Sequence, residues 1–245
     1  MTNNPDQENV ILLLTRPLGG NERFCLKIKH LLYGCEILDN PIQRIDFLPS
    51  LSKVNKNSVL IFTSANGLRA AKKHNLINKK CFVVGANTKK IAVSFGYDVL
   101  GFSKDQENLL KLIKSKKPTE SMGHIRGKHT VGNLCSALKR SQFSCLEIIG
   151  YNQEPLKIKK QNLQKIHSGR PVILPIFSSR SAELLQSNLD LTGFNVIAIS
   201  EAVAKIVTGV ELGELVISKK PDLNSMQEAT LAILRRLIKF DGSTS

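Results

Sequence analysis

The chain has 245 residues, of which 42% are hydrophobic, and a formal net charge of +15. This length suits one large domain or two domains of roughly 100–150 residues, and no apolar run reaches the roughly 18–20 residues that a membrane-spanning helix needs. The first ten residues lack the basic and apolar regions of a signal peptide, so we expect a soluble, cytoplasmic protein without a membrane partner.

The apolar segments are short, rich in β-branched residues and bounded by polar residues or glycine, which is typical of buried strands. They predict six strands, at Val10–Leu14, Val59–Phe62, Phe82–Val84, Val172–Ile176, Val196–Ile199 and Leu215–Ile217. Helical periodicity occurs between most of them, for example after Ser64 or Asn66 and across Leu223–Leu237. Such alternation of strands and helices predicts an α/β fold with parallel sheets that helices cover on both faces.

Short matches recur in order at two nearly equal offsets, which indicates two copies of one α/β unit. An offset of 110 aligns identical residues, Arg16 with Arg126, Cys25 with Cys135 and Cys35 with Cys145. An offset of 115 aligns similar segments, 62–64 with 177–179, 82–85 with 197–200, and 90–92 with 205–207. The connections at 35–48 and 146–155 follow the first helix of each copy, and we expect them to pair as a bridge between two domains.

The positive charge is concentrated in the middle of the chain. Residues 46–146 contain 18 Lys and Arg against 5 Asp and Glu, whereas the remainder contains 17 against 15. This charge favours an anionic partner such as nucleic acid, acidic lipid or a polycarboxylate. The alternative is a solvated lysine-rich surface, because 25 of the 35 basic residues are Lys and carboxylate sites more often use Arg. Without aromatic interleaving or a reading motif, we expect no specific nucleic-acid partner.

Ser, Thr and small residues follow four of the predicted strands, at 63–67, 85–88, 178–181 and 200–202. Ligands of open parallel sheets bind beyond the carboxyl ends of the strands, where helix N-termini offer N–H groups and a positive dipole end to anions. The alternative for each turn is ordinary helix capping. Four equivalent turns nevertheless predict an anion-binding cleft between two facing domains.

Motifs of conventional catalysis are absent from the sequence. We find no P-loop, no GxGxxG, no GxSxG, no HExxH and no paired Asp, and we therefore expect neither a metal nor a cofactor. The five cysteines have no CxxC spacing, and we expect them to be small core residues rather than a disulfide framework. His124 and His129 flank Arg126-Gly127-Lys128, which we interpret as an exposed loop or, alternatively, an anion-binding loop.

The order and spacing of these motifs resemble those of the uroporphyrinogen-III synthase family. The similar segments extend from about Val10 to about Leu234 and comprise Leu14-Thr15-Arg16-Pro17, residues 62–67, Val84-Gly85 with Thr88, Arg126-Gly127, residues 149–152 and residues 177–179. One turn departs from the family, because Ser200-Glu201-Ala202-Val203 stands where Gly and Thr are usual. Glu201 adds negative charge there, and Val203 lacks the expected hydroxyl.

The resemblance implies two similar flavodoxin-like parallel-sheet domains, joined by a two-stranded linker, with a cleft between them. It assigns residues 1–36 with 156–245 to domain 1, residues 37–47 and 147–155 to the linker strands, and residues 48–146 to domain 2. The basic middle of the chain is then one domain.

The resemblance also implies a cofactor-free, monomeric lyase of haem biosynthesis. Such a cyclising hydro-lyase converts hydroxymethylbilane, a linear tetrapyrrole polycarboxylate, into uroporphyrinogen III with loss of water and inversion of the last pyrrole ring. The substrate-binding residues that we expect are Arg16, Thr63, Ser64, Ala65, Asn66, Gly85, Thr88, Arg126, Gly127, Ser178, Ser179 and Ser200. Tyr151 is the candidate general acid or, alternatively, a packed strand residue. Two other functions stay open: a bilobal anion-binding module without activity, and a basic nucleic-acid-binding protein.

Overall fold

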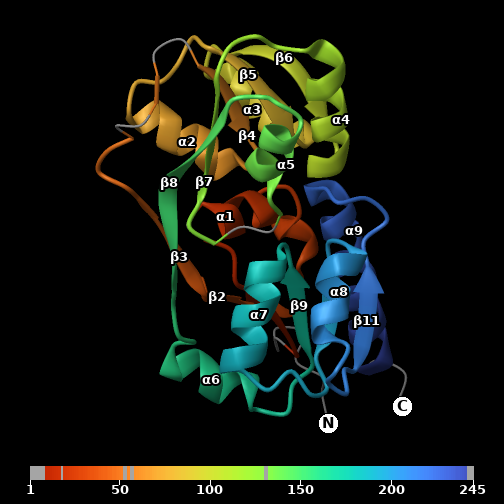
Figure 1. The fold of residues 1–245 in the computed structure, drawn as a ribbon. Helices are drawn as coiled ribbons and strands as arrows, with labels where there is room; N and C mark the ends of the chain where they lie inside the picture. Colours follow the sequence, from red (N-terminus) through yellow and green to blue (C-terminus); the bar gives the residue numbers. More distant parts are fainter. Residues whose placement is uncertain (1–8, 18, 52–53, 56–57, 130–131, 242–245) are drawn as a thin grey trace. The chain divides into compact units, whose positions relative to one another are not determined.

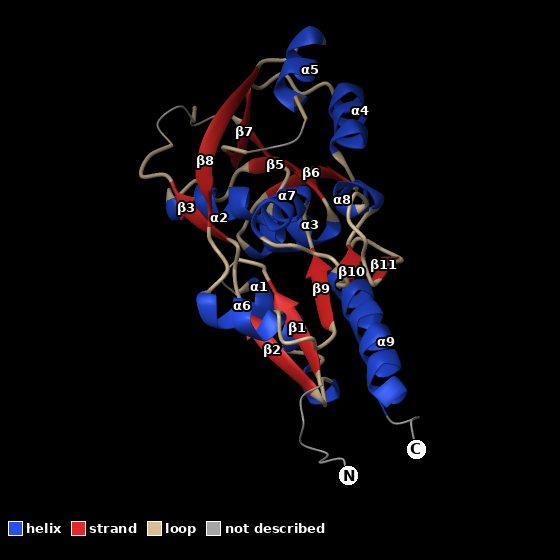
Figure 2. Ribbon diagram, turned by 90° about the horizontal axis from the view of Figure 1, so that it is seen from below, coloured by secondary structure: helices blue, strands red, loops and turns tan. Residues whose placement is uncertain are grey.

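The computed structural model (Figure 1) describes residues 9–17, 19–51, 54–55, 58–129 and 132–241, with no side-chain description for 239–241. The chain divides into two units: unit 1 comprises Met1–Arg44 and Pro155–Ser245, and unit 2 comprises Ile45–Glu154. Helices and strands alternate in each unit (Figure 2), and each contains one sheet in which parallel strand pairs dominate. The predicted α/β fold class is confirmed.

The sheet of unit 1 has the strand order β11-β10-β9-β1-β2. Its strands are β1 (Val10–Leu14), β2 (Cys35–Asp39), β9 (Val172–Ile176), β10 (Asn195–Ala198) and β11 (Glu214–Ile217). Its helices are α1 (Gly20–Cys25), the short η1 (Lys29–Leu31), α6 (Lys160–Ile166), α7 (Ser179–Asn188), α8 (Glu201–Val207) and α9 (Leu223–Asp241). All neighbouring strands run parallel, in the order 2-1-3-4-5 that flavodoxin-like folds share.

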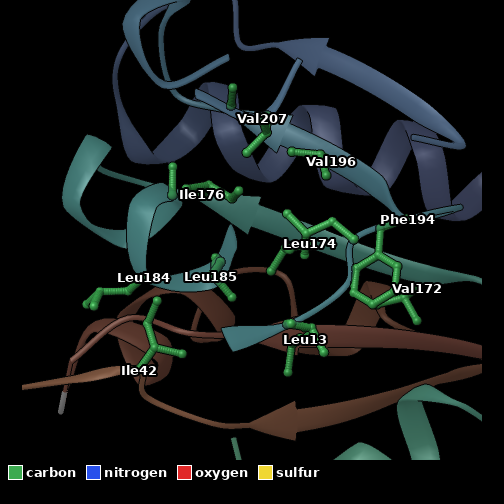
Figure 3. Close-up of a cluster of buried hydrophobic side chains, with 14 of the residues drawn as sticks. Leu13, Ile42, Val172, Leu174, Ile176, Leu184, Leu185, Phe194, Val196 and Val207 are labelled. Carbon is green, nitrogen blue, oxygen red and sulfur yellow. The ribbon is translucent and has the colours of Figure 1, made fainter. Parts of the chain in front are cut away.

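Both faces of this sheet are buried. Leu13, Leu174 and Val196 point to one face, where Leu184 and Leu185 of α7 pack against the strands (Figure 3). On the other face, Leu12 belongs to a second core with Phe24 of α1 and residues of α9. Strands that are buried on both faces read as continuous apolar runs, which is why β1 and β9 are recognisable in the sequence.

The sheet of unit 2 has the order β3-β8-β7-β4-β5-β6. Its strands are β3 (Gln43–Phe47), β4 (Val59–Phe62), β5 (Lys80–Val84), β6 (Asp98–Ser103), β7 (Met122–Gly127) and β8 (Cys145–Pro155). Helices α2 (Ala65–Lys73) and α3 (Ala86–Ser94) cover one face, and α4 (Gln106–Lys116) and α5 (Leu134–Arg140) cover the other. Strand β3 lies beside the long strand β8 (Figure 1), so segments of the two predicted connections are neighbours.

The two sheets have the same strand order when they are matched as the sequence repeat predicts. Strands β7, β8, β4, β5 and β6 of unit 2 then take the places of β1, β2, β9, β10 and β11 of unit 1. The offset of 110 relates the first two strands of each set, and the offset of 115 relates the other three. The topology therefore supports two copies of one α/β unit.

Five strands are not among the six predicted from apolar runs; two of them, β3 and β8, lie in the two connections that we expected to pair, which leaves β2, β6 and β7. Strands β2 and β6 lie at sheet edges, where exposure on one side permits polar residues, as Asp98 and Ser103 illustrate. Strand β7 is central, but it carries His124, Arg126 and two glycines. Its apolar signal is therefore weak even though the strand is largely buried.

Cys135 and Cys145 form a disulfide, contrary to the expectation that all five cysteines are simple core residues. Both also belong to the core between the unit 2 sheet and α4 and α5. Their Cα atoms lie 5.3 Å apart, within the range that a disulfide spans. Cys135 lies near the start of α5 and Cys145 begins β8. The disulfide forms because the fold brings these two starts together, and the ten-residue spacing of the cysteines in the sequence does not predict that.

Among the described residues, no helix combines the length and hydropathy of a segment that crosses a bilayer.

Candidate active site

Each sheet has one switch point, the gap between two strands from which the chain proceeds in opposite directions. In unit 1 it lies between β1 and β9, and in unit 2 it lies between β7 and β4. Ligands of doubly wound sheets bind outside the carboxyl ends of the strands at such a point. The polar turns after β9 and β4, together with Arg16 and Arg126-Gly127, lie at these two positions.

The turn after β4 brings together Ser64 and Tyr151, which are 87 residues apart in the chain. The Ser64 side chain accepts a hydrogen bond from the Gly67 N–H at 3.3 Å and thereby caps α2. The same oxygen lies 2.9 Å from the Tyr151 hydroxyl. Helix capping and a site role are therefore compatible at this turn, because one hydroxyl serves both contacts.

Gly127 permits this position of Tyr151. A Cβ atom at residue 127 would lie 2.7 Å from the Tyr151 ring, closer than non-bonded carbon atoms approach. Burial raises the pKa of Tyr151, and hydrogen bonds from Ser64 and from the Gly127 main chain oppose that effect. The phenol is consequently protonated at neutral pH and carries a proton that it is able to donate.

Thr63 and His124 form a second polar pair at the same switch point. The Thr63 hydroxyl lies 3.1 Å from Nε2 of His124, because β4 and β7 pair with Ile61 opposite His124. Only 2% of His124 is exposed, so the exposed loop expected at 124–129 is wrong for this residue. Sequence reasoning missed its contact with Thr63, since a strand with a weak apolar pattern gives no sign that its histidine is buried.

Burial lowers the pKa of His124 to about 4, with Glu147 opposing this effect and Arg126 reinforcing it. In the unfolded chain the imidazole has a pKa near 6.5. Below that pH the unfolded state therefore binds more protons than the folded state, and the unfolding free energy decreases as the pH is lowered. The stability that the neutral His124 contributes is fully present above pH 6.5 and is lost as the pH falls towards 4. We expect this loss to lower the unfolding free energy of the wild type by about 2 kcal/mol between pH 7 and pH 5.

Urea denaturation of the wild type and of His124→Gln at both pH values measures this contribution, because the variant has no imidazole at that position. The variant should lose correspondingly less unfolding free energy between the two conditions. Equal losses in the two proteins would contradict a buried neutral His124.

Arg126 is engaged with its neighbours in unit 2. Its Nε donates to Glu147 at 3.1 Å, its Nη2 pairs with the same carboxylate at 2.5 Å, and its Nη1 donates to the Gly127 carbonyl at 2.8 Å. The ion pair ties β7 to β8 beside His124. Glu147 is a second residue that sequence reasoning missed, because its role depends on the register of two strands.

The remaining predicted residues of unit 2 lie at the starts of α2 and α3. Ala65 and Asn66 open α2, and Asn66 accepts a hydrogen bond from Arg69 at 2.7 Å. Gly85 precedes α3, and its N–H donates to the Ser103 carbonyl. Thr88 is buried in the first turn of α3, so its hydroxyl is less accessible than the turn itself.

In unit 1 the switch point joins Arg16 to the turn after β9. The Arg16 guanidinium lies 4.1 Å from the centre of the Phe177 ring, and its main-chain N–H donates to Asn21. Ser178 caps α7 by accepting from the Ser181 N–H at 3.1 Å, and Ser179 is the first residue of that helix. The Arg16 cation thus lies against Phe177, the residue that precedes the helix cap Ser178.

The turn at residues 200–203 differs from the turns at Ser64 and Ser178. Ser200 precedes α8, but its side chain makes no capping hydrogen bond. Glu201 is exposed in the first turn of α8, and Val203 is buried in the core. Val203 therefore offers no hydroxyl at this turn, and the exposed carboxylate of Glu201 opposes anion binding.

Unit 1 also has a cavity of about 560 Å³, which is separate from the polar turns. Its lining includes Arg170 and Pro171, which precede β9, and Gly193 and Phe194, which precede β10. These residues are at the amino ends of the strands, whereas the polar turns are at the carboxyl ends. We therefore place the candidate site at the turns.

Known proteins resemble this chain in sequence and in fold. Residues 32–228 match the family model described as Uroporphyrinogen-III synthase HemD. The structure is similar to that of uroporphyrinogen-III synthetase from Helicobacter pylori, with a TM-score of 0.66 and 14% identity over 92% of this chain and 99% of that one.

A mutant uroporphyrinogen III synthase from Thermus thermophilus gives a TM-score of 0.58 and 15% identity over 94% of this chain and 99% of that one. These two likenesses concern the fold, and comparison with curated proteins gave no match. The family match covers most of the chain, including the turns at both switch points. The chain therefore belongs to the uroporphyrinogen-III synthase family, whose members are enzymes of tetrapyrrole biosynthesis.

Proposed function

We propose that this protein is a lyase that converts hydroxymethylbilane into uroporphyrinogen III, with loss of water and inversion of the last pyrrole ring. Family membership supports the reaction class. The observation that carries the proposal is the 2.9 Å contact between the Tyr151 and Ser64 hydroxyls at the unit 2 switch point. It puts a protonated phenol beside a helix N-terminus that suits a carboxylate.

The substrate's acetates and propionates meet hydrogen-bond donors in this proposal. In unit 2 the N-terminal turn of α2 offers N–H groups, and Thr63 and Ser64 offer hydroxyls. In unit 1, taken by itself, the N-terminal turn of α7 and the hydroxyls of Ser178 and Ser179 offer the same kinds of donor. Arg16, and the basic charge of residues 46–146, draw a polyanion towards these turns. Arg126 contributes by holding the Gly127 turn in place, since its donors are directed at Glu147 and at the main chain.

Tyr151 acts as the general acid. Its O–H proton passes to the terminal hydroxyl of the bilane, and water leaves while electrons from the attached pyrrole form an azafulvenium cation, whose charge balances that of the Tyr151 phenolate. The Ser64 hydroxyl and the Gly127 main chain stabilise the phenolate that remains, which is consistent with their opposing the rise of the Tyr151 pKa. One such acid supplies roughly 10²–10⁴-fold in rate.

The later steps require geometry more than proton transfer. The azafulvenium carbon is attacked by the substituted position of the last ring, and the resulting spiro intermediate fragments and recloses with that ring inverted. Reclosure expels a proton from the last ring, and this proton restores the Tyr151 phenol. Without an enzyme the bilane closes without inversion, so the protein must hold one conformation. Positioning of this kind is worth up to roughly 7–11 kcal/mol of a barrier, which is consistent with a site that has a single candidate acid.

Product analysis tests the proposal directly. Hydroxymethylbilane is generated in situ with and without the protein, the products are oxidised, and their ring isomers are separated by chromatography. We expect the type III isomer to replace the symmetric type I isomer when the protein is present. Type I at the level of the protein-free control, with folded protein, would contradict the proposed reaction.

The second candidate is a diverged family member without activity, an anion-binding module that binds through its other turns; the altered residues Glu201 and Val203 favour this loss of activity. Such a module binds the bilane or a stable porphyrin polycarboxylate without producing type III isomer, so the same assay distinguishes it. A cytoplasmic location, a monomeric state and the lack of a specific nucleic-acid partner stay predictions from the sequence.

A further inference from the structure

The Thr63–His124 pair raises the question of which group donates the hydrogen bond. Nε2 of His124 lies 3.1 Å from the Thr63 hydroxyl. Its other ring nitrogen, Nδ1, is buried, and the described residues offer it no hydrogen-bond partner. Thr63, a partly exposed residue, directly follows β4 at the switch point, beside the start of α2.

A neutral imidazole carries its proton on one of its two nitrogens. With the proton on Nδ1, a buried N–H donor lacks a partner, which is rare and costly in proteins. With the proton on Nε2, the N–H donates to Thr63, and only an acceptor lone pair is left buried. The doubly protonated ring is disfavoured at neutral pH, because burial lowers the pKa of His124 to about 4.

We infer that His124 is a positioning residue that donates from Nε2 to the Thr63 hydroxyl and so leaves the Thr63 proton to be donated to a substrate carboxylate. The inference rests on the proposed function for its ligand, a bilane carboxylate. It adds a role for a buried residue that touches no substrate. In the opposite tautomer the Thr63 proton is used by His124, and the hydroxyl presents only lone pairs, which repel a carboxylate.

The tautomer is measurable without any activity. Long-range ¹H–¹⁵N spectra of ¹⁵N-histidine-labelled protein at pH 7 distinguish a proton on Nε2 from one on Nδ1, and the signals absent from His124→Gln identify His124. His74 is an internal reference, because its Nε2 lies 2.8 Å from the Leu48 carbonyl, which only accepts. We expect His124 to show the same tautomer as His74, and a proton on Nδ1 of His124 would overturn the inference.

Kinetics of the full chain test the consequence for binding. We expect Thr63→Val to raise KM about tenfold with little change in kcat, since a hydrogen bond to a charged group is lost. His124→Leu should raise KM to a similar extent, and the double variant no further, because both changes remove one donor. His124→Gln retains an N–H near the position of Nε2 and should restore most of the affinity.

His74→Leu is the matched control, because it also removes a histidine hydrogen bond in unit 2 but lies away from the switch point. It should lower stability without raising KM. A wild-type KM in folded His124→Leu, or a loss in His124→Gln as large as in His124→Leu, would overturn the inference. Failure of the proposed function is a separate result, namely the absence of type III isomer with the wild type.

Discussion

Tyr151→Phe is expected to lower kcat for formation of the type III isomer by about 100-fold or more while the protein stays folded. The substitution removes the one phenolic proton at the unit 2 switch point and keeps the ring against Gly127. The ring is 5% exposed and belongs to the core beneath α2, so its packing survives. Single-turnover measurements of product isomers, with far-UV circular dichroism of the variant, report both parts of the expectation.

Tyr97→Phe provides the matched control. Tyr97 is 5% exposed, belongs to the same core, and donates its hydroxyl proton to the Leu76 carbonyl. Each substitution therefore removes one buried hydroxyl hydrogen bond from unit 2, at a cost of about 1 kcal/mol of unfolding free energy. Tyr97 is not part of the polar turns, and Tyr97→Phe should retain the wild-type kcat.

The comparison separates catalysis from stability. A fall in kcat for Tyr151→Phe alone assigns the proton transfer to Tyr151. Equal rates for the wild type and Tyr151→Phe would remove Tyr151 from the mechanism and leave it as a packed strand residue. The family assignment does not depend on this outcome.

Gly67→Ala is expected to lower the unfolding free energy by about 3 kcal/mol. A Cβ at this position would lie 2.5 Å from the Ile125 carbonyl oxygen and 3.3 Å from the Phe62 ring. The closer neighbour is backbone of β7, a strand held in place on both sides, so α2 must move away from the sheet. On helix propensity alone the substitution would stabilise α2 by about 1 kcal/mol, and the sign of the result therefore reports the close approach.

Gly209→Ala is the control for this substitution. Gly209 follows α8, and a Cβ there would have no atom within 4 Å. We expect a change between zero and a stabilisation of about 1 kcal/mol, because alanine restricts the unfolded chain. Urea denaturation curves of both variants and the wild type give the comparison. Similar stabilities for Gly67→Ala and Gly209→Ala would show that α2 does not rest directly on β7.

The displacement of α2 should also be visible in activity. Ser64 caps this helix and contacts Tyr151, so a shift of α2 changes the position of the Ser64 hydroxyl. We expect folded Gly67→Ala to produce less type III isomer than Gly209→Ala under identical conditions.

Features that depend on local interactions are readable from the amino-acid order. Continuous apolar runs identify the doubly buried strands, such as β1 and β9, because each of their side chains must leave water. Ser64 and Ser178 are recognisable as helix starts, since a cap involves a residue only three positions away. The internal repeat and the motifs of the family are likewise matters of order along the chain.

Which of these elements meet in space depends on the packing of the whole chain. Tyr151 reaches Ser64, His124 reaches Thr63, and Glu147 holds Arg126 because of the register of β8, β7 and β4. Strand pairing and packing also explain three further features that sequence reasoning did not identify. These are the strand character of β7, the edge strands β2 and β6, and the disulfide between Cys135 and Cys145. Strand pairing joins residues far apart in the chain, and a shift of one residue turns each side chain to the other face, so these contacts have no local signature.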